Sequence, residues 1–327
     1  MISAAGTATG FVRTLESPTG GATRRVRARV IAKADPELAA IYAQANETTT
    51  EADLRRSERD LLAGRYGLPV ERVIMLQQVH GDRALEIPAK AFAPGAIASG
   101  PGNHEPPSAI NATDPIDPAG ATGAIFFDEG DALYSGESGV LLVIRTADCL
   151  PLFFDLSLND SRQSDSAAAA HAPHSESKSI VGIIHAGWRG LAAGIISRTL
   201  VEALAKLRGS GHRSGEFRGR FFFGPCIGAE SYEVGADVAD HFTHKQSLPE
   251  AGKYLLDLAA NARLEIDRAL AGHARDFGMD PAEVAANCEF LNDGPGNQGC
   301  TYQSNDLYFS HRRGDRGRNL NAILIEE

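Results

Sequence analysis

Two apolar stretches decide the fold: GVLLVIRTADCLPLFFD at residues 139–155 and SIVGIIHAGWRG at residues 179–190. In the first, two runs rich in Val, Leu, Ile and Phe flank the polar RTADC. In the second, a short apolar run ends in a Gly-rich turn. Short apolar runs bounded by turn residues predict buried strands. Further out, RGRFFFGPCIG at 218–228 predicts a strand that Gly-Pro ends, and VERVIMLQQVHG at 70–81 begins as a strand.

Helices are indicated where apolar residues recur about every 3.6 positions. Residues 51–67 predict a helix with Gly67 as its C-cap, and residues 254–271 predict an amphipathic helix. Because strands and helices mix without strict βαβ alternation, the sequence predicts an α/β fold of the layered α+β kind, with mixed sheets covered by helices. A TIM barrel and a Rossmann sheet are excluded. A further helix is expected after HAGWRG, on the helical spacing of Leu191, Ile195, Ile196, Leu200, Leu204 and Leu207.

Composition excludes several classes of protein. Hydrophobic residues make up 43% of the 327 positions, enough to bury a core. The 32 basic and 42 acidic residues give a net charge of −10, which disfavours binding to nucleic acid or anionic membranes. No stretch approaches the ~18–20 apolar residues of a membrane span, and the first residues lack the pattern of a signal peptide. Four cysteines are not a disulfide scaffold. These features predict a cytoplasmic protein with reduced thiols.

Two segments differ in composition from the rest. Residues 88–122 hold seven of the sixteen prolines, and residues 159–179 hold eleven Ser or Ala. Such compositions bury too little apolar surface to offset chain entropy, so both are interpreted as loop insertions. They lie inside a single catalytic domain at residues 51–327, and residues 1–50 are left as a poorly assigned N-terminal part.

Three residues with ligating side chains end apolar strands. His80 ends QQVHG, Cys149 lies in RTADC and His185 opens HAGWRG. A thiolate and two imidazoles suit a borderline-soft metal and leave a fourth position open, as in catalytic zinc sites. A histidine at a strand end is more commonly a structural residue, so from the residues alone both interpretations stand. The paired histidines of HAPH (171–174) and HFTH (241–244) are interpreted as solvated, the second pair on a helix surface.

Five motifs stand out along the chain: QVHG, DALYSGESGVLLVIRTADCLPLFFD, HAGWRGLAAGI, GPCIGAESYEVG and CTYQSNDLYFSHRRGDRGR. Together they resemble the YfiH family, also described as multicopper polyphenol oxidoreductases or laccase-domain proteins. The resemblance covers about residues 56–327 and implies that His80, Cys149 and His185 bind Zn²⁺. A bound Cu²⁺ would be adventitious.

Further site residues follow from the resemblance. Arg189 could hold an anionic group such as phosphate, and Asp148 could orient a ligand or move a proton; a structural ion pair and a turn cap are the alternatives. The Asn-Arg pair of the family appears here as Glu58-Arg59, so Arg59 is a candidate catalytic residue. The N-terminal family pattern is not recognisable in residues 1–50. Weaker expectations concern Asp131 as a site residue, and Cys226 and Cys300 as structural cysteines. Arg312 and Arg313 either close over the site or pair with the acidic surface, and the second interpretation is favoured.

The implied activity is that of a zinc-dependent purine nucleoside phosphorylase, a transferase. Adenosine deamination, a hydrolase activity, and methylthioadenosine phosphorolysis accompany it in the family. The expected partners are a nucleoside and phosphate. One alternative is a hydrolase that edits a peptidoglycan precursor. Another is a laccase-like copper oxidase, which a chain with ten histidines and no His-x-His pair supports poorly. A non-catalytic binding module is the last.

Overall fold

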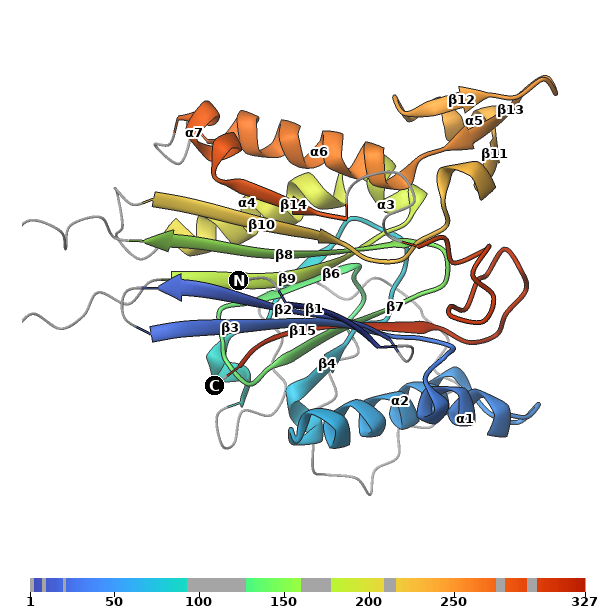
Figure 1. Ribbon diagram of the computed structural model, residues 1–327, viewed down its shortest axis with the longest axis horizontal. Helices are drawn as coiled ribbons and strands as arrows, with labels where there is room; N and C mark the ends of the chain where they lie inside the picture. The colour runs from blue at the N-terminus through green and yellow to red at the C-terminus, as the bar shows by residue number, and fades with distance from the viewer. Residues whose placement is uncertain are drawn as a thin grey trace, which may run out of the picture.

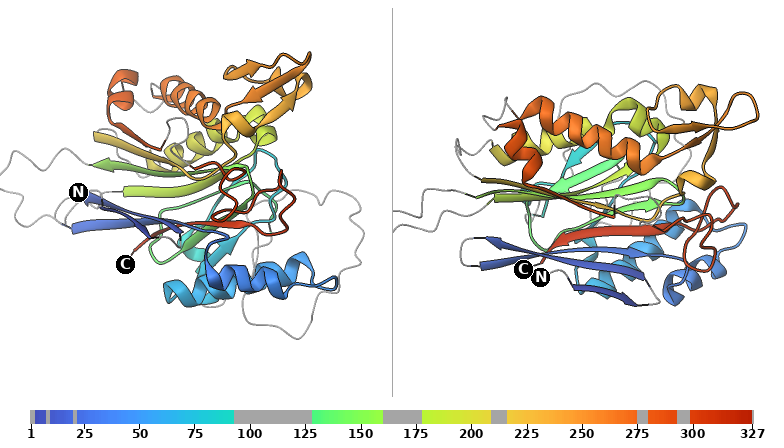
Figure 2. Two further views of the ribbon diagram at one scale, coloured as in Figure 1. Left: turned by 45° about the vertical axis from the view of Figure 1, so that its right-hand side comes forward. Right: turned by 45° about the horizontal axis from the view of Figure 1, so that its top comes forward.

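Two six-stranded sheets lie face to face, and helices cover the outer face of each (Figures 1 and 2). This computed structural model describes residues 3–7, 10–19, 22–92, 128–159, 178–208, 216–274, 280–292 and 299–326. The layers confirm the predicted α/β class with mixed sheets. Most of the segments 88–122 and 159–179 and the whole HAPH motif lie outside the described residues.

The first sheet has the strand order β1-β2-β3-β15-β7-β4. Neighbouring strands are antiparallel except β4 and β7, which are parallel. The strand nearest the C-terminus thus lies between two strands from earlier in the chain. The bounds are β1 Ser3–Thr7, β2 Gly10–Thr19, β3 Ala22–Ile31, β4 Val73–Met75, β7 Leu141–Thr146 and β15 Asn319–Ile325.

The second sheet has the order β14-β10-β8-β9-β6-β5. Its centre, β10-β8-β9-β6, is antiparallel, and each edge strand is parallel to its neighbour. A three-residue turn, 147–149, joins β7 of the first sheet to β8 of the second. The bounds are β5 Ala84–Glu86, β6 Ala132–Ser135, β8 Leu150–Asn159, β9 Lys178–Ala186, β10 Glu216–Phe223 and β14 Cys288–Leu291.

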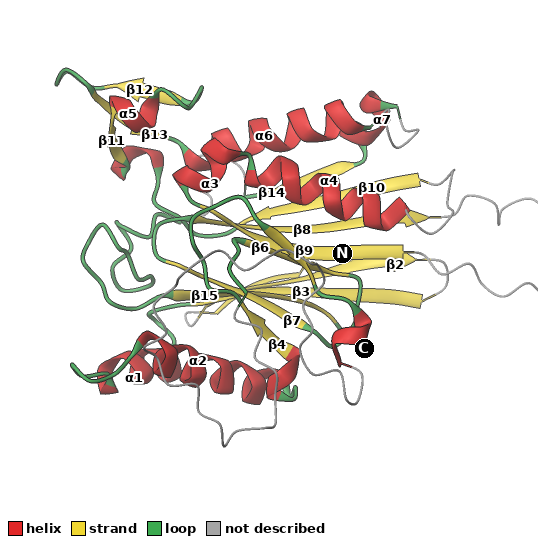
Figure 3. Cartoon of the chain, turned by 180° about the vertical axis from the view of Figure 1, so that it is seen from behind, coloured by secondary structure: helices red, strands yellow, loops and turns green. Residues whose placement is uncertain are grey.

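Helices complete the outer layers, and a small three-stranded sheet, β11-β13-β12, precedes the longest helix of the second layer (Figure 3). The pair α1 and α2 covers the first sheet, and α3, α4, α6 and α7 cover the second. The helices are α1 Pro36–Gln44, α2 Glu51–Tyr66, α3 Trp188–Ala193, α4 Ile195–Arg208, α5 Ala236–Ala239, α6 Leu258–His273 and α7 Pro281–Ala286; the small strands are β11 Glu233–Gly235, β12 Lys245–Ser247 and β13 Lys253–Leu256; short 3₁₀ turns are η1 Val70–Arg72, η2 Ala89–Phe92 and η5 Ala229–Ser231.

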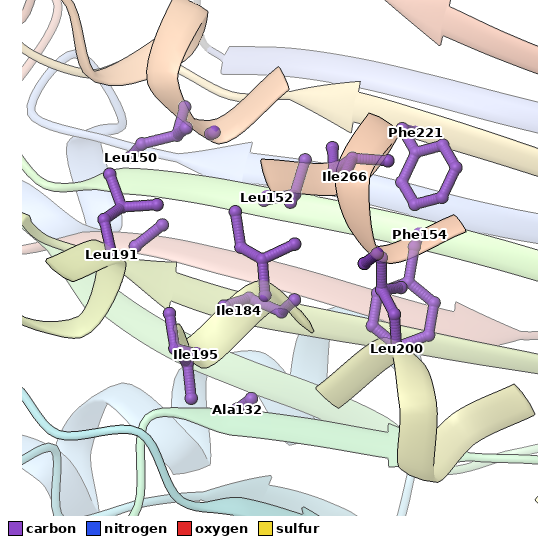
Figure 4. Packing of buried hydrophobic residues seen from close by; sticks show 14 of the residues in the cluster. Ala132, Leu150, Leu152, Phe154, Ile184, Leu191, Ile195, Leu200, Phe221 and Ile266 are labelled. Atoms are coloured by element: carbon purple, nitrogen blue, oxygen red, sulfur yellow. The ribbon is translucent and has the colours of Figure 1, made fainter. Parts of the chain in front are cut away.

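The strands β7, β8 and β9 are covered on both faces, which explains their continuous apolar runs. In β7, Leu142 and Ile144 point into the core between the sheets, whereas Leu141 and Val143 pack under α1 and α2. The largest core lies between the second sheet and its helices. Figure 4 shows side chains of β8, β9 and β10 meeting those of α3, α4 and α6 there. Rigid strands packed in this way fix the loops at their ends.

The helix predicted at residues 51–67 is confirmed. Thr50 and Asp53 form a capping box at its start, and Gly67 adopts the left-handed conformation (φ 64°) as its C-cap. The other helix predictions were partly wrong. The helix after HAGWRG breaks at Gly194 (φ 82°), which ends α3 before α4 begins. The helix predicted from residue 254 begins at Leu258, because residues 253–256 pair in β13 instead.

The N-terminal part left unassigned by the sequence carries β1, β2, β3 and α1. Its last strand, β3, pairs with β15 from Val26↔Ile325 to Ile31↔Leu320, so it is built into the first sheet. His241 and His244 lie in the turn that follows α5, so the prediction of a helix surface for HFTH was wrong. Among the described residues, no helix has both the length and the apolar character that crossing a membrane requires.

Candidate metal centre

His80, Cys149 and His185 come together although 105 positions separate the first from the last in the chain. One possible ligand atom from each lies within 4.8 Å of the others. His80 lies in the loop after β4, Cys149 in the turn between β7 and β8, and His185 near the end of β9. Because Pro151 of β8 pairs with His185, the Cys149 turn lies beside that histidine. The two imidazole rings meet edge to face, with centroids 4.8 Å apart.

The backbone at this centre is unusual for residues with side chains. His80 (φ 61°) and Asp148 (φ 85°) both adopt left-handed conformations that mainly glycine favours. Gly187 is required for another reason: a Cβ there would lie 2.9 Å from the Cys149 sulfur. Strained non-glycine residues gather where the surrounding structure holds them for a purpose. Here one such residue, His80, belongs to the group of ligating side chains, and the other, Asp148, directly precedes Cys149.

Asp131 binds two of the three ligand segments from a fully buried position. Its Oδ1 accepts a hydrogen bond from His185 Nδ1 at 2.8 Å and from the His80 backbone N–H at 3.0 Å. Its Oδ2 accepts from the N–H groups of Gly81 at 2.7 Å and Val79 at 3.3 Å. A carboxylate that binds one ring nitrogen fixes the tautomer and leaves the other nitrogen free for a ligand. Asp131 therefore orients His185 and holds the His80 loop.

The charges of the centre favour a thiolate at Cys149. Burial opposes the charged sulfur, but the charge of His185 and hydrogen bonds from both histidines outweigh it and lower the pKa of Cys149 to about 6. Burial likewise opposes a charged His185, yet the thiolate and Asp131 raise the pKa of its imidazole to about 9. Burial raises the pKa of Cys226 and Cys288 instead. Only a deprotonated thiol binds a metal ion, so Cys149 is suited to that role.

In metal-free protein, Cys149 is expected to react with iodoacetamide with a midpoint near pH 6, because its pKa is lowered to about that value. The rate should fall as pH decreases through 6, where the thiolate gains its proton, and Zn²⁺ should suppress it at every pH. Alkylation followed by peptide mass spectrometry measures this, with Cys149→Ser as the control. A midpoint above pH 8 would contradict it.

The donor set fits a tetrahedral zinc ion. Zinc binds imidazole nitrogen at ~2.0–2.1 Å and thiolate sulfur at ~2.3 Å, so ligand atoms within a few ångströms of one another can share one ion. Two imidazoles, a thiolate and a carboxylate behind one imidazole match this chemistry. Three protein ligands leave a fourth position open for a substrate or water.

Asp148, predicted as a site residue, binds the C-terminal segment rather than the ligating atoms. Its carboxylate accepts hydrogen bonds from Thr301 Oγ1 at 2.6 Å, Ser310 Oγ at 3.0 Å and the Arg312 N–H at 2.7 Å. The residue next to Cys149 therefore anchors the loop of residues 300–313 beside the ligand turn. A role of Asp148 in orienting a ligand or moving a proton stays a prediction.

Arg189 and Arg312 bring positive charge to the rim of the centre. The Arg189 guanidinium lies 4.4 Å from the centroid of the Trp188 ring, is exposed, and has no acidic partner among the described residues. Arg312 lies over the Tyr232 ring at 5.4 Å and donates to the Glu233 carbonyl at 2.9 Å. Burial and the nearby Cys149 thiolate raise the pKa of Tyr232 to about 12, against the opposing charges of Arg312 and Arg189. Tyr232 thus shares one electrostatic neighbourhood with the thiolate and both arginines.

Three other residues were singled out from the sequence: Arg59, Arg313 and Cys226. Arg59 lies on α2, and its role as a catalytic residue stays a prediction. Arg313 donates to the carbonyls of Thr301, Tyr302 and Tyr308 and pairs with Asp315, so it braces the C-terminal loop from within. Cys226 is buried and forms a β-bridge with Cys300.

Sequence reasoning missed Gln78 and Tyr232. The Gln78 side chain forms two hydrogen bonds with the backbone of Arg145. Both residues lie in motifs singled out above, QQVHG and GAESYEVG, but neither carries a metal-ligating group that would draw notice. Their positions next to the ligands become apparent only once the strands are placed.

Fold and site together define an α/β protein with a group of three side chains that could hold a metal ion. A family model described as "Multi-copper polyphenol oxidoreductase laccase" matches residues 38–175 and 173–326. The chain belongs to this family, which includes proteins named YfiH.

Known relatives carry the name of an enzyme. Purine nucleoside phosphorylase YfiH of Shigella flexneri is 30% identical over 189 residues, which cover 56% of this chain and 58% of the relative. The match thus spans little more than half the length of that relative. Purine nucleoside phosphorylase of Haemophilus influenzae is 26% identical over 281 residues, 83% of this chain and 81% of the relative.

Solved structures share the fold. YlmD from Geobacillus stearothermophilus superposes with a TM-score of 0.56 at 24% identity, covering 95% of this chain and 98% of that one. The Bacillus licheniformis protein YfiH gives a TM-score of 0.56 at 21% identity, covering 92% and 93%. At this level of identity the likeness supports the fold alone.

Proposed function

We propose that this chain is a zinc-dependent purine nucleoside phosphorylase whose metal ion is held by His80, Cys149 and His185. The observation that carries the proposal is the gathering of one thiol and two imidazoles within 4.8 Å at the ends of strands from both sheets. The names of the relatives from Shigella flexneri and Haemophilus influenzae supply the reaction class. The reaction transfers the ribosyl group of a purine nucleoside to phosphate and releases the free base and ribose 1-phosphate.

The residues at the rim supply binding groups for both reactants. Arg189 and Arg312 offer guanidinium groups for the phosphate, because their donor forks match its oxygens. The Tyr232 ring offers a flat surface for a purine, and Val79, 45% exposed beside His80, offers an apolar one. A bound zinc ion supplies Lewis-acid chemistry at its open position. Asp131 holds His185 in one orientation throughout.

Two further activities belong to the proposal because they need no further site. Methylthioadenosine phosphorolysis uses the same phosphate and purine contacts with a different 5′ substituent. Adenosine deamination replaces the purine 6-amino group with oxygen from water and releases ammonia. Adenosine deamination is recognised by its independence of phosphate, and methylthioadenosine phosphorolysis by its products.

Copper oxidation is the second candidate, since the family description names it. A multicopper cluster uses many histidines, mostly in His-x-His pairs, whereas this chain has ten histidines and no such pair. Within the described residues, His80, Cys149 and His185 are the group found able to hold a metal ion. Cu²⁺ binds nitrogen and sulfur donors more tightly than Zn²⁺, so copper could displace zinc from these ligands.

Product analysis tests the proposal. Purified protein with its metal content measured is incubated with adenosine, inosine or guanosine, with and without phosphate, and the products are separated by chromatography. Phosphate-dependent free base with ribose 1-phosphate is expected, and Cys149→Ala should reduce it to the level without enzyme. Inosine formed from adenosine without phosphate would demonstrate deamination. Unchanged nucleosides in a zinc-loaded sample would contradict the proposal, and a peptidoglycan precursor would then be the next substrate.

A further inference from the structure

The parallel pairing of β4 with β7 stops just before the ligand segments. It runs from Val73↔Leu141 to Met75↔Val143. Gln77 then pairs with residues 128–130, which precede β6 of the second sheet: its N–H donates to the Asp128 carbonyl, and its carbonyl accepts from the Gly130 N–H. The backbone of Arg145, two residues past the last pair on β7, consequently has no backbone partner from the His80 segment.

The Gln78 side chain takes the place of the missing strand partner. The Arg145 N–H donates to Gln78 Oε1 at 2.7 Å, and Gln78 Nε2 donates to the Arg145 carbonyl at 2.9 Å. A side-chain amide has the same donor and acceptor as a peptide group, so it can satisfy both backbone groups at once. Because Arg145 is buried, neither group has ready access to water as a replacement.

Gln78 binds to a residue that is itself held in place. The Arg145 side chain forms an ion pair with Glu58 of α2, in which Nε lies 2.7 Å from Oε2. Both side chains are almost fully buried, with exposed fractions of 7% and 0%. A buried ion pair of this kind ties β7 to α2 beneath it. Gln78 therefore connects the His80 loop to a strand that cannot easily shift.

Both ligands lie a short distance along the chain from this contact. His80 follows Gln78 by two residues, and Cys149 follows Arg145 by four. Each segment contains a residue in the left-handed conformation: His80, itself a ligating residue, and Asp148, which directly precedes Cys149. Such a conformation persists only when neighbouring groups support it. Asp131 supports the His80 loop from the second sheet. Support from the first sheet comes from Gln78.

We propose that Gln78 is a positioning residue of the metal centre, and that its amide sets the separation between His80 and Cys149 by joining their two segments. This inference rests on the proposed metal centre. Gln78 touches neither substrate nor ion; it acts through the backbone that carries the ligands. Groups that orient ligands in this way typically contribute about 10–100-fold to metal affinity.

The test replaces Gln78 with methionine, which keeps the length of the side chain and removes both hydrogen bonds. Co²⁺ serves as the probe, because its visible absorption reports ligand geometry. Gln78→Met is expected to bind Co²⁺ about 10–100-fold more weakly and with altered absorption bands. Gln77→Met is the matched control, since Gln77 is exposed and its side chain makes only a 3.5 Å contact with Glu129. It should bind Co²⁺ as the wild type does.

A second comparison separates positioning from general loss of stability. Leu62→Ala creates a cavity between α2 and the first sheet, and should lower the melting temperature without changing Co²⁺ affinity. Equal affinity and spectra in Gln78→Met and Gln77→Met would overturn the positioning role, as would an equal loss of affinity in Leu62→Ala. If the wild type binds no Co²⁺ or Zn²⁺, the metal centre itself is contradicted, and this inference fails with it.

Discussion

Replacing Arg145 with methionine is expected to lower the free energy of unfolding by about 3–5 kcal/mol, since the change leaves a buried carboxyl group without its charged partner. Glu58 is fully buried, accepts a hydrogen bond from Arg145 Nη2 at 3.1 Å, and forms an ion pair with Arg145 Nε at 2.7 Å. Tyr42 also donates to Glu58, and Glu51 pairs with the same guanidinium. Urea unfolding followed by circular dichroism measures the loss.

The loss should grow with pH. Burial already raises the pKa of Glu58 against the charge of Arg145, and removal of Arg145 raises it further. A raised carboxyl pKa means that the folded protein binds the proton more tightly than the unfolded chain, so stability falls as pH rises above the ordinary carboxyl pKa. The variant should therefore be less destabilised at pH 5.5 than at pH 8.

Two controls distinguish a buried pair from an exposed one. Lys206→Met removes a partner of Glu86 from a pair at 2.7 Å that is largely exposed, and should cost less than about 1 kcal/mol. The triple variant Arg145→Met, Glu58→Leu, Tyr42→Phe removes the stranded polar groups and should recover much of the loss. If Arg145→Met were no less stable than Lys206→Met, the buried pair would not hold α2 to the sheet.

The sequence predicts β7, β8 and β9 well because these strands are covered on both faces. Residues 139–155 and 179–190 read as continuous apolar runs, and the structure gives β7, β8 and β9 there. The helices are less predictable. Gly194 interrupts an apolar periodicity that continues on both sides of it. Tyr254, Leu255 and Leu256 are apolar side chains that suit a strand and a helix equally well. Tertiary pairing decides such cases.

The candidate centre is only partly visible in the sequence. Chemistry singles out His80, Cys149 and His185, since thiol and imidazole groups are rare and stand at strand ends. It says little about Asp148, because a carboxylate beside a ligand has several uses, and the observed one depends on a loop more than 150 residues away. A side-chain amide such as that of Gln78 gives no local sequence signal of a role in the site. Its role arises from the crossing of the chain between the two sheets.

Asp131→Ala is expected to have the largest effect on metal binding of any change outside the three ligands. It removes the acceptor of His185 Nδ1 and of the backbone N–H groups of Val79, His80 and Gly81. Loss of a single partner of a metal-bound histidine typically costs about 10–100-fold in affinity. Because Asp131 also supports the segment of a second ligand, the loss should reach or exceed the upper end of that range. Competition for Zn²⁺ with a chromophoric chelator measures it.

Asp155→Ala is the matched control, because Asp155 is another buried aspartate of the second sheet whose partner is Arg220. Both variants should unfold at lower urea concentration, since each leaves buried groups without a partner, but only Asp131→Ala should lose zinc affinity. Asp131→Asn should fall between wild type and Asp131→Ala, as its amide keeps one acceptor oxygen and places a donor toward the backbone N–H groups. Equal zinc affinity in the two alanine variants would show that the His80 loop and the His185 ring keep their places without the carboxylate. The strands themselves would then be what preorganises the centre.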